Sequence, residues 1–156
     1  MKVTEVQGTK LHLVATTVDV SDAAAIATAI AGAETLACIQ EIGDISLGTK
    51  AVTEYSCISS DSSFKSLGSV TLGNISPSLL FDAADTAGQN DLQDMWDNNT
   101  RRILIVELDD QITTNPTYIT FEAAISAPSL GIAKDSAVMY NPTIEICSKP
   151  AMIEAT

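Results

Sequence analysis

The sequence predicts a mainly β fold: a β-sandwich or small barrel of about seven strands with one flanking α-helix at residues ~85–98. Seven segments have the apolar–polar alternation or the β-branched composition that is typical of strands. Turn residues separate these segments, and one further segment has the apolar spacing of an amphipathic helix. A chain of 156 residues buries about two-thirds of its extended surface on folding, which favours a single domain spanning residues 1–156.

The strands are predicted in chain order from alternation and from the turn residues that bound them. The segments are residues 9–18, 36–47, 51–58, 67–81, 103–108, 117–125 and 137–147. Gly43 indicates a bend within the second segment, and Pro77 indicates an edge or a break within the fourth. The turn at residues 48–50 predicts that residues 51–58 return as a hairpin partner of residues 36–47.

Two segments are predicted to be irregular. The Ala-rich segment 19–33 has little bulk to bury, and its composition allows either a helical turn or an extended surface loop. The Ser-rich segment 59–66 is polar and is predicted to be a flexible loop.

The predicted helix carries three apolar residues at i, i+3 and i+4: Leu92, Met95 and Trp96. Asp82 or Asp85 can cap its start, and Asn98 or Asn99 can adopt the left-handed conformation that ends a helix. An apolar stripe of this kind is predicted to pack in the core. The alternative is that part of it forms a subunit contact, because Trp and Met are enriched at interfaces.

The charge excludes several function classes. With 20 acidic and 8 basic residues the formal net charge is −12, so tight binding to nucleic-acid phosphates or to an anionic membrane is not expected. Aromatic residues make up 4% of the chain, too few for a base-stacking platform. At 46% apolar residues the chain is predicted to fold, and its longest apolar window, residues 23–33, is too short to span a membrane.

The three cysteines, Cys38, Cys57 and Cys147, are odd in number and far apart. The N-terminal residues lack the apolar run of a signal peptide, which together with the cysteine pattern predicts free thiols and synthesis in a reducing cytoplasm. The alternative, a zinc site formed with the single histidine His12, lacks the Cys-x-x-Cys spacing of structural zinc sites. No metal and no cofactor is predicted.

No catalytic constellation is found, and we predict that the protein is not an enzyme. Residues 43–50 have the glycine spacing of a phosphate-binding loop, but the final Thr49-Lys50 is inverted and a strand is expected to follow. The adjacent carboxylates Asp109 and Asp110 are interpreted as a solvated turn, because neighbouring residues at a strand end point apart and no histidine is near in sequence.

The order of several segments resembles the major tail tube protein family of long-tailed bacteriophages. Residues 38–45 (CIQEIGDI) are similar to an early strand of that family, and residues 67–75 (LGSVTLGNI) to its Gly-Ser-Val segment. The helix near residues 89–99, the basic-then-apolar strand 101–108 and residues 120–125 (TFEAAI) follow in the family's order. The resemblance covers most of residues 35–147 and does not include the Ala-rich segment 19–33.

The resemblance implies a structural virion protein of the phage tail. Members of the family form hexameric rings whose strands make a continuous inner barrel, and the rings stack into a tube through which DNA passes without tight binding. The resemblance also implies assembly in the host cytoplasm with tape-measure, tail-tip and tail-terminator proteins as partners, and no membrane partner. Two alternatives are an inner-tube protein of a type VI secretion-like contractile system and a β-sandwich decoration or adhesion module.

Two sets of residues are predicted for such a tube. Carboxylates on the strands that could line the lumen and repel the DNA backbone are Glu41, Glu54, Glu107 and Glu122; ordinary solvation is the alternative. The residues predicted to contact the next ring lie in the Ser-rich segment 59–66 and are Ser59, Asp61, Phe64 and Lys65.

Overall fold

A computed structural model describes residues 5–56, 58–59, 61–84, 88–109 and 116–154, and nearly half of them lie in the strands of antiparallel β-sheets. The largest sheet contains β1 (Glu5–Val14), β2 (Glu34–Thr35), β6 (Asn74–Ile75), β8 (Arg102–Asp109), β9 (Tyr118–Ala127), β12 (Thr143–Ile146) and β13 (Ala151–Ile153). Its order is β2-β1-β8-β9-β12-β6, and β13 pairs with the first half of β9. The predicted mainly β fold is confirmed.

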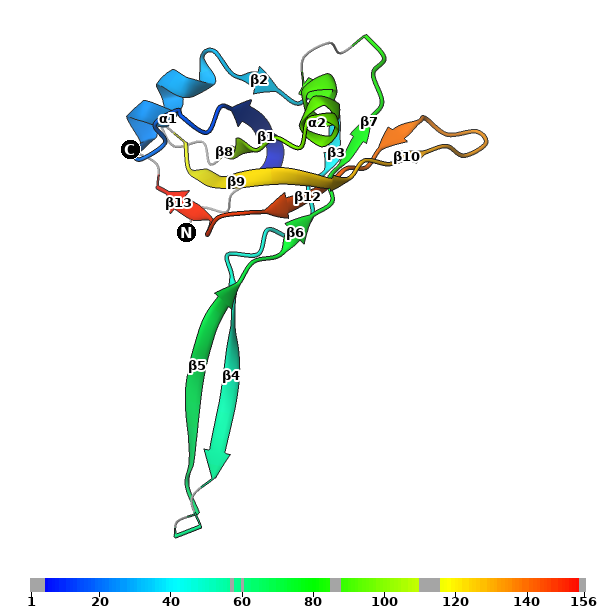
Figure 1. Cartoon of the computed structure of the whole chain (residues 1–156). Coiled ribbons are helices and arrows are strands. Elements are labelled where there is room, and N and C mark those ends of the chain that lie inside the picture. The colour runs from blue at the N-terminus through cyan, green and yellow to red at the C-terminus, as the bar shows by residue number, and fades with distance from the viewer. Residues whose placement is uncertain (1–4, 57, 60, 85–87, 110–115, 155–156) are drawn as a thin grey trace.

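A second sheet faces the first across the main core (Figure 1). Its strands are β3 (Ile39–Glu41), β7 (Ser78–Leu80), β10 (Leu130–Gly131) and β11 (Met139–Tyr140), in the order β10-β11-β7-β3. Alternation places Leu11, Leu104 and Phe121 of the large sheet in one buried cluster with Leu79 and Tyr140 of the second sheet. The core is therefore that of a β-sandwich.

Helix α2 (Gly88–Asp97) closes one side of this core, as predicted. Asn99 has a left-handed φ of 52°, and the N–H of Thr100 donates to the carbonyl of Met95, so the helix ends where the asparagines predict. Asp82, one of the two predicted caps, accepts a hydrogen bond from the N–H of Ala84; the other, Asp85, lies outside the described residues.

The prediction of a single helix is wrong, because part of the Ala-rich segment forms α1 (Ala23–Ile30). Asp22 caps it by accepting a 2.7 Å hydrogen bond from the N–H of Ala25. Ile26 is fully buried against Ile103 and Ile105, on the face of the large sheet opposite the main core. One well-placed isoleucine and small alanines suffice for this packing, which is why the segment showed no broad apolar stripe.

The predicted hairpin between residues 36–47 and 51–58 is also wrong. Strand β4 (Thr49–Ser56) pairs with β5 (Ser63–Thr71), which follows it, and not with the segment before it. Residues 63–66 therefore belong to a strand, and the predicted loop is shorter than 59–66. Both Gly43 (φ 81°) and Gly48 (φ 113°) have left-handed φ values, so the chain bends at both positions and regular pairing of residues 36–47 is limited to β3.

Other predicted strands are divided by prolines. Residues 67–81 contribute to β5, β6 and β7, with Pro77 between the last two, as predicted from its missing N–H. Residues 137–147 divide into β11 and β12 on either side of Pro142. The uninterrupted segments 103–108 and 117–125 correspond closely to β8 and β9, at the centre of the large sheet.

Candidate assembly surface

Strands β4 and β5 form a two-stranded arm that projects away from the sandwich (Figure 1). We use "the arm" for residues 49–71. At about 3.3 Å per residue, strands of 8 and 9 residues extend about 26–30 Å. Every described residue of the two strands is exposed, so the arm contributes nothing to the core of its own subunit.

The cross-strand register places apolar residues on both faces of the arm. Tyr55 lies opposite Phe64 near the tip, and both are more than half exposed, at 59% and 61%. Val52 lies opposite Leu67 on the other face of the arm, and both side chains are exposed. Apolar cross-strand pairs stabilise a ribbon only modestly, so these side chains remain available to a second surface.

Both long edges of the arm are also open. Among the described residues, β4 and β5 pair with each other and with no further strand, so each exposes one row of backbone N–H and C=O groups. Isolated two-stranded ribbons are marginally stable in water, and monomeric proteins protect edges of this length. The arm therefore has the properties of a segment that is completed by another chain.

The base of the arm depends on one glycine. A Cβ atom on Gly48 would lie 2.6 Å from Cγ1 of Val70, and the φ of 113° is strained for any other residue. Farther out, a Cβ on Gly68 would lie 3.3 Å from that of Ala51 across the ribbon. These contacts require small residues for the strands to approach closely.

Charge is distributed unevenly between the arm and the sandwich. Lys50 and Lys65 balance Glu54 and Asp61, so the arm has no formal net charge and the rest of the chain carries the full −12. Sandwiches of this charge repel one another, whereas a neutral apolar arm can approach a neighbour without that cost. The arm is thus the extended part of the molecule that is best suited to contact another copy.

The four predicted ring-contact residues all lie toward the far end of the arm. Ser59 and Asp61 are exposed in the turn, while Phe64 and Lys65 begin β5. Lys65 lies directly opposite Glu54, an exposed pair of opposite charge. The structure brings these residues together on the arm, although as part of a strand and its turn rather than as a flexible loop.

The four predicted lumen carboxylates do not form one cluster. Glu41 ends β3 and is exposed, and Glu54 lies on the arm. Glu107 and Glu122 lie on the same face of the large sheet, on neighbouring strands, and both have cationic partners. The guanidinium of Arg101 is 3.3 Å from Glu122, and the ammonium of Lys10 is 3.8 Å from Glu107.

The single histidine has a structural environment. His12 is 3% exposed, and its Nδ1 and Nε2 atoms lie 2.9 Å from the Thr35 hydroxyl and 2.8 Å from a carboxylate oxygen of Glu107. These contacts tie β1 to β2 and to β8, so both ring nitrogens are occupied. Cys38 and Cys147 are free thiols, and Cys57 lies outside the described residues.

The helix stripe is divided between core and surface. Leu92 and Met95 are buried in the main cluster, whereas Trp96 is 44% exposed. Arg102 of β8 donates a 2.7 Å hydrogen bond to Asp91 and fastens the helix to the large sheet. Leu92 and Met95 thus occupy core positions, and Trp96 is the member of the stripe with an exposed surface.

The described residues include neither a metal-binding cluster of side chains nor a membrane-spanning helix. No group of three or more His, Cys, Asp or Glu side chains there is arranged to hold a metal ion. Within the same residues, no helix is both long and apolar enough to cross a bilayer.

The fold is shared with chains of several solved tail and injection-system structures. A chain of the PVC sheath/tube terminator, from an extracellular contractile injection system, superposes with a TM-score of 0.69 at 12% identity over 97% of both chains. The SPP1 tail tube gives 0.70 at 13% identity, over 98% of this chain and 80% of the other. No family model matches the sequence, and no curated protein does.

A chain from the tail of an empty GTA particle, refined with C6 symmetry, gives a TM-score of 0.66 at 13% identity over 99% of this chain and all of the other. The predicted tail-tube-like fold is confirmed by these similarities. Pairing in the arm was missed from the sequence, although a signal was present: two alternating segments flank a short Ser-rich turn, which is the pattern of a hairpin.

Proposed function

We propose that this protein is a tail tube subunit that self-assembles into stacked rings around a central channel. The observation that carries the proposal is the exposure of the arm. Its two strands extend about 26 Å, have apolar residues on both faces and two open edges, and are not covered by their own subunit. Such a segment is completed by neighbouring copies. The fold shared with the SPP1 tail tube supports the same function.

In this proposal each ring contains six subunits. Tape-measure, tail-tip and tail-terminator proteins direct assembly in the host cytoplasm. In the virion tail, DNA passes through the channel. The C6 symmetry of the GTA tail supports six subunits in a ring. The net charge of −12 supports a channel that does not retain DNA, because like charges repel within about 8 Å at physiological salt. The protein acts mechanically, as a conduit, and catalyses no reaction.

Shortening the arm tests the proposal. Thr53 pairs with Ser66, so replacing residues 54–65 by Asn-Gly closes the ribbon with a two-residue turn in the same register. We expect this variant to remain a folded monomer by circular dichroism and sedimentation, and to form no tubes under conditions where the wild type does. Tubes of normal length and yield from the variant would contradict the proposal.

The lumen carboxylates have a separate test. A variant with Glu41→Gln, Glu54→Gln and Glu122→Gln spares Glu107, whose contact with His12 joins two strands. We expect particles that contain this variant to have intact tubes and slower genome release. Release at the wild-type rate would leave solubility as the role of these charges.

A second candidate is the inner tube of a contractile injection system. The similarity to chains of the PVC and anti-feeding prophage assemblies, with TM-scores of 0.69 and 0.71, favours it on the same fold. The two candidates differ in what surrounds the tube. Electron microscopy of the native particle distinguishes them, because a contractile sheath around the tube is present in one and absent from a flexible phage tail.

A further inference from the structure

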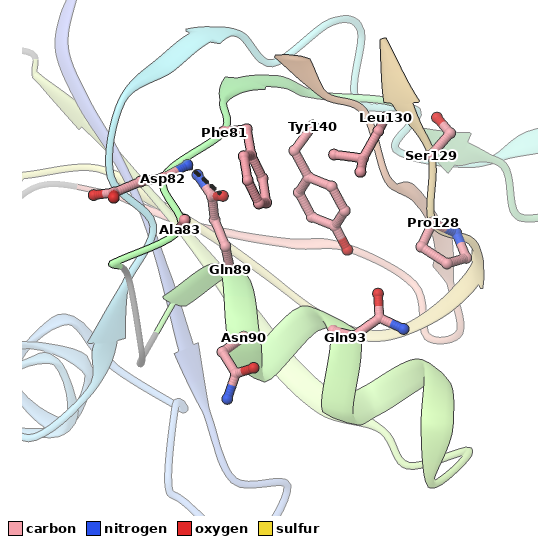
Figure 2. Close-up of a pocket in the computed structure, with 10 residues that line it drawn as sticks. All are labelled: Phe81, Asp82, Ala83, Gln89, Asn90, Gln93, Pro128, Ser129, Leu130 and Tyr140. Carbon is pink, nitrogen blue, oxygen red and sulfur yellow. Dashed lines mark hydrogen bonds between the residues drawn. The ribbon is translucent and has the colours of Figure 1, made fainter. Parts of the chain in front are cut away.

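Figure 2 shows a cavity of about 430 Å³. The elements that line it lie at the end of the sandwich opposite the arm (Figure 1). Its walls come from the end of β7, from α2 and from β10 and β11. The apolar part of the lining consists of Phe81, Ala83, Pro128, Leu130 and the ring of Tyr140. Phe81 and Leu130 are about half exposed although they are large apolar side chains, so this surface has unburied apolar area.

The cavity walls are held in place by hydrogen bonds. Gln89 donates to the carbonyl of Leu80 (2.7 Å) and accepts from the N–H of Asp82 (3.2 Å), which fixes Phe81 between them. On the other wall, the hydroxyl and the carbonyl of Ser129 both bond the backbone of Asn141. A cavity built in this way is present before any partner arrives.

The cavity also contains a polar atom without a partner. Tyr140 is 6% exposed, and its hydroxyl, which Figure 2 shows directed toward Gln93 and Pro128, makes no hydrogen bond within the described part of the chain. A buried hydroxyl in this condition is costly, and native proteins rarely retain one. The hydroxyl is therefore an unsatisfied hydrogen-bonding group in the wall of the cavity.

We infer that this cavity receives the tip of the arm of a second copy of this chain, with Phe64 as the side chain that enters it. The inference rests on the proposed function and deepens it by naming the two surfaces that meet between rings. Phe64 and Tyr55 are exposed together near the arm tip, with no cover from their own subunit. A cavity of about 150 Å³ accommodates benzene, so one of about 430 Å³ has room for a phenyl ring and its strand.

Polarity and position agree with this occupant. The open edge of an arm strand offers unpaired carbonyls to the Tyr140 hydroxyl. The arm and the elements that line the cavity, α2, β7 and β10, lie at opposite ends of the molecule (Figure 1). A contact between different surfaces is head-to-tail, so it repeats without closing and stacks one subunit on the next.

Intermolecular disulfide formation tests the contact directly. In a background with C38S, C57S and C147S, protein with Phe64→Cys is mixed with protein with Leu130→Cys, tubes are assembled and oxidised, and dimers are measured on a non-reducing gel. A disulfide requires Cα atoms about 4.4–6.8 Å apart, so only a close approach forms it. The matched control replaces Leu67 instead of Phe64, on the other face of the same strand.

We expect the Phe64–Leu130 pair to form dimers at least about tenfold more efficiently than the Leu67–Leu130 pair in tubes. Equal yields from the two pairs, in tubes of normal appearance, would overturn the docking of Phe64 and leave the proposed function intact. If wild-type protein forms no tubes under any condition, the proposed function fails, and the docking fails with it.

A second pair of variants measures the energetic effect. Leu130→Asp places a charge in the cavity wall, and Ile132→Asp places the same charge two residues away on an exposed position outside the lining. We expect Leu130→Asp to raise the protein concentration needed for assembly about tenfold or more, because loss of one buried aromatic contact has that effect. Ile132→Asp should leave that concentration nearly unchanged. The same shift for both variants would contradict a specific role of the cavity.

Discussion

Tyr55 and Phe64 lie directly opposite each other across the two strands of the arm, and both are exposed, at 59% and 61%. Aromatic residues are costly to leave in water, and a pair of them stabilises an isolated ribbon by only about 0.2–1 kcal/mol. Their position near the tip of an uncovered hairpin is explained by contact with another subunit. In the proposed function, the arm is therefore the feature through which one copy contacts the next.

The helix stripe predicts different effects for its members. Leu92→Ala should lower the free energy of unfolding by about 2–5 kcal/mol, because Leu92 is fully buried and the cavity left behind is not refilled. Trp96→Ala should lower it by less than about 1 kcal/mol, because the indole is 44% exposed. Urea unfolding of the monomer measures both. A monomer as sensitive to Trp96→Ala as to Leu92→Ala would show that Trp96 belongs to the core.

The ion pair between Arg102 and Asp91 should stabilise the packing of α2 on the large sheet. The pair is short, at 2.7 Å, and partly buried, so Arg102→Ala is expected to lower stability by about 1–2 kcal/mol. Arg101→Ala is the matched control: its contact with Glu122 is longer and more exposed, and we expect an effect below about 0.5 kcal/mol. Equal losses from the two substitutions would mean that the Asp91 contact has no special role.

Gly48→Ala should loosen the base of the arm without unfolding the sandwich. The added Cβ meets Val70 at 2.6 Å and the φ of 113° is strained, whereas Gly43→Ala introduces strain at φ 81° with nothing within 4 Å. We expect Gly48→Ala to give faster hydrogen exchange in residues 49–71 and an unchanged exchange pattern in β8 and β9. If Gly43→Ala accelerates exchange in the arm equally, contact with Val70 is not the cause.

Tyr140→Phe should change the alkaline stability of the protein. Burial raises the pKa of Tyr140 above its usual value of 10.0, with a further contribution from the charge of Asp97. The protonated phenol is thus favoured in the folded state, and its contribution is complete below about pH 10 and lost as the pH rises toward the folded-state pKa.

We therefore expect the wild type to lose stability above about pH 10 more steeply than Tyr140→Phe does, in thermal unfolding measured as a function of pH. At neutral pH the variant should be as stable as the wild type or more stable by about 1 kcal/mol, since it removes an unpaired buried hydroxyl. Parallel pH profiles for the two proteins would show that ionisation of Tyr140 does not contribute to the loss of stability at high pH.

The sequence was sufficient for the parts of the fold that depend on local pattern. Strands β8 and β9 alternate without interruption, and α2 has its apolar stripe and its terminal Asn99, so each was predicted close to its observed bounds. Helix α1 was left open because its contact with the sheet depends chiefly on Ile26, and one residue makes no pattern.

The arm required information that alternation alone does not contain. Strand β4 has glycine-containing turn residues before it and a Ser-rich turn after it, so it could pair in either direction along the chain. The left-handed φ of Gly48 directs β4 away from β3. No residue of β4 is buried, so packing in the core does not select its partner strand. The cavity brings together β7, α2 and β10–β11, segments far apart in sequence.

Cryo-electron microscopy of concentrated, purified wild-type protein beside the variant with the shortened arm shows whether this chain builds a tube. We expect the wild type to form stacked rings with a central channel, in which each arm extends from one ring to contact the next, and the variant to remain as dispersed single subunits. A wild type that remains a uniform monomer at high concentration would contradict the proposed function.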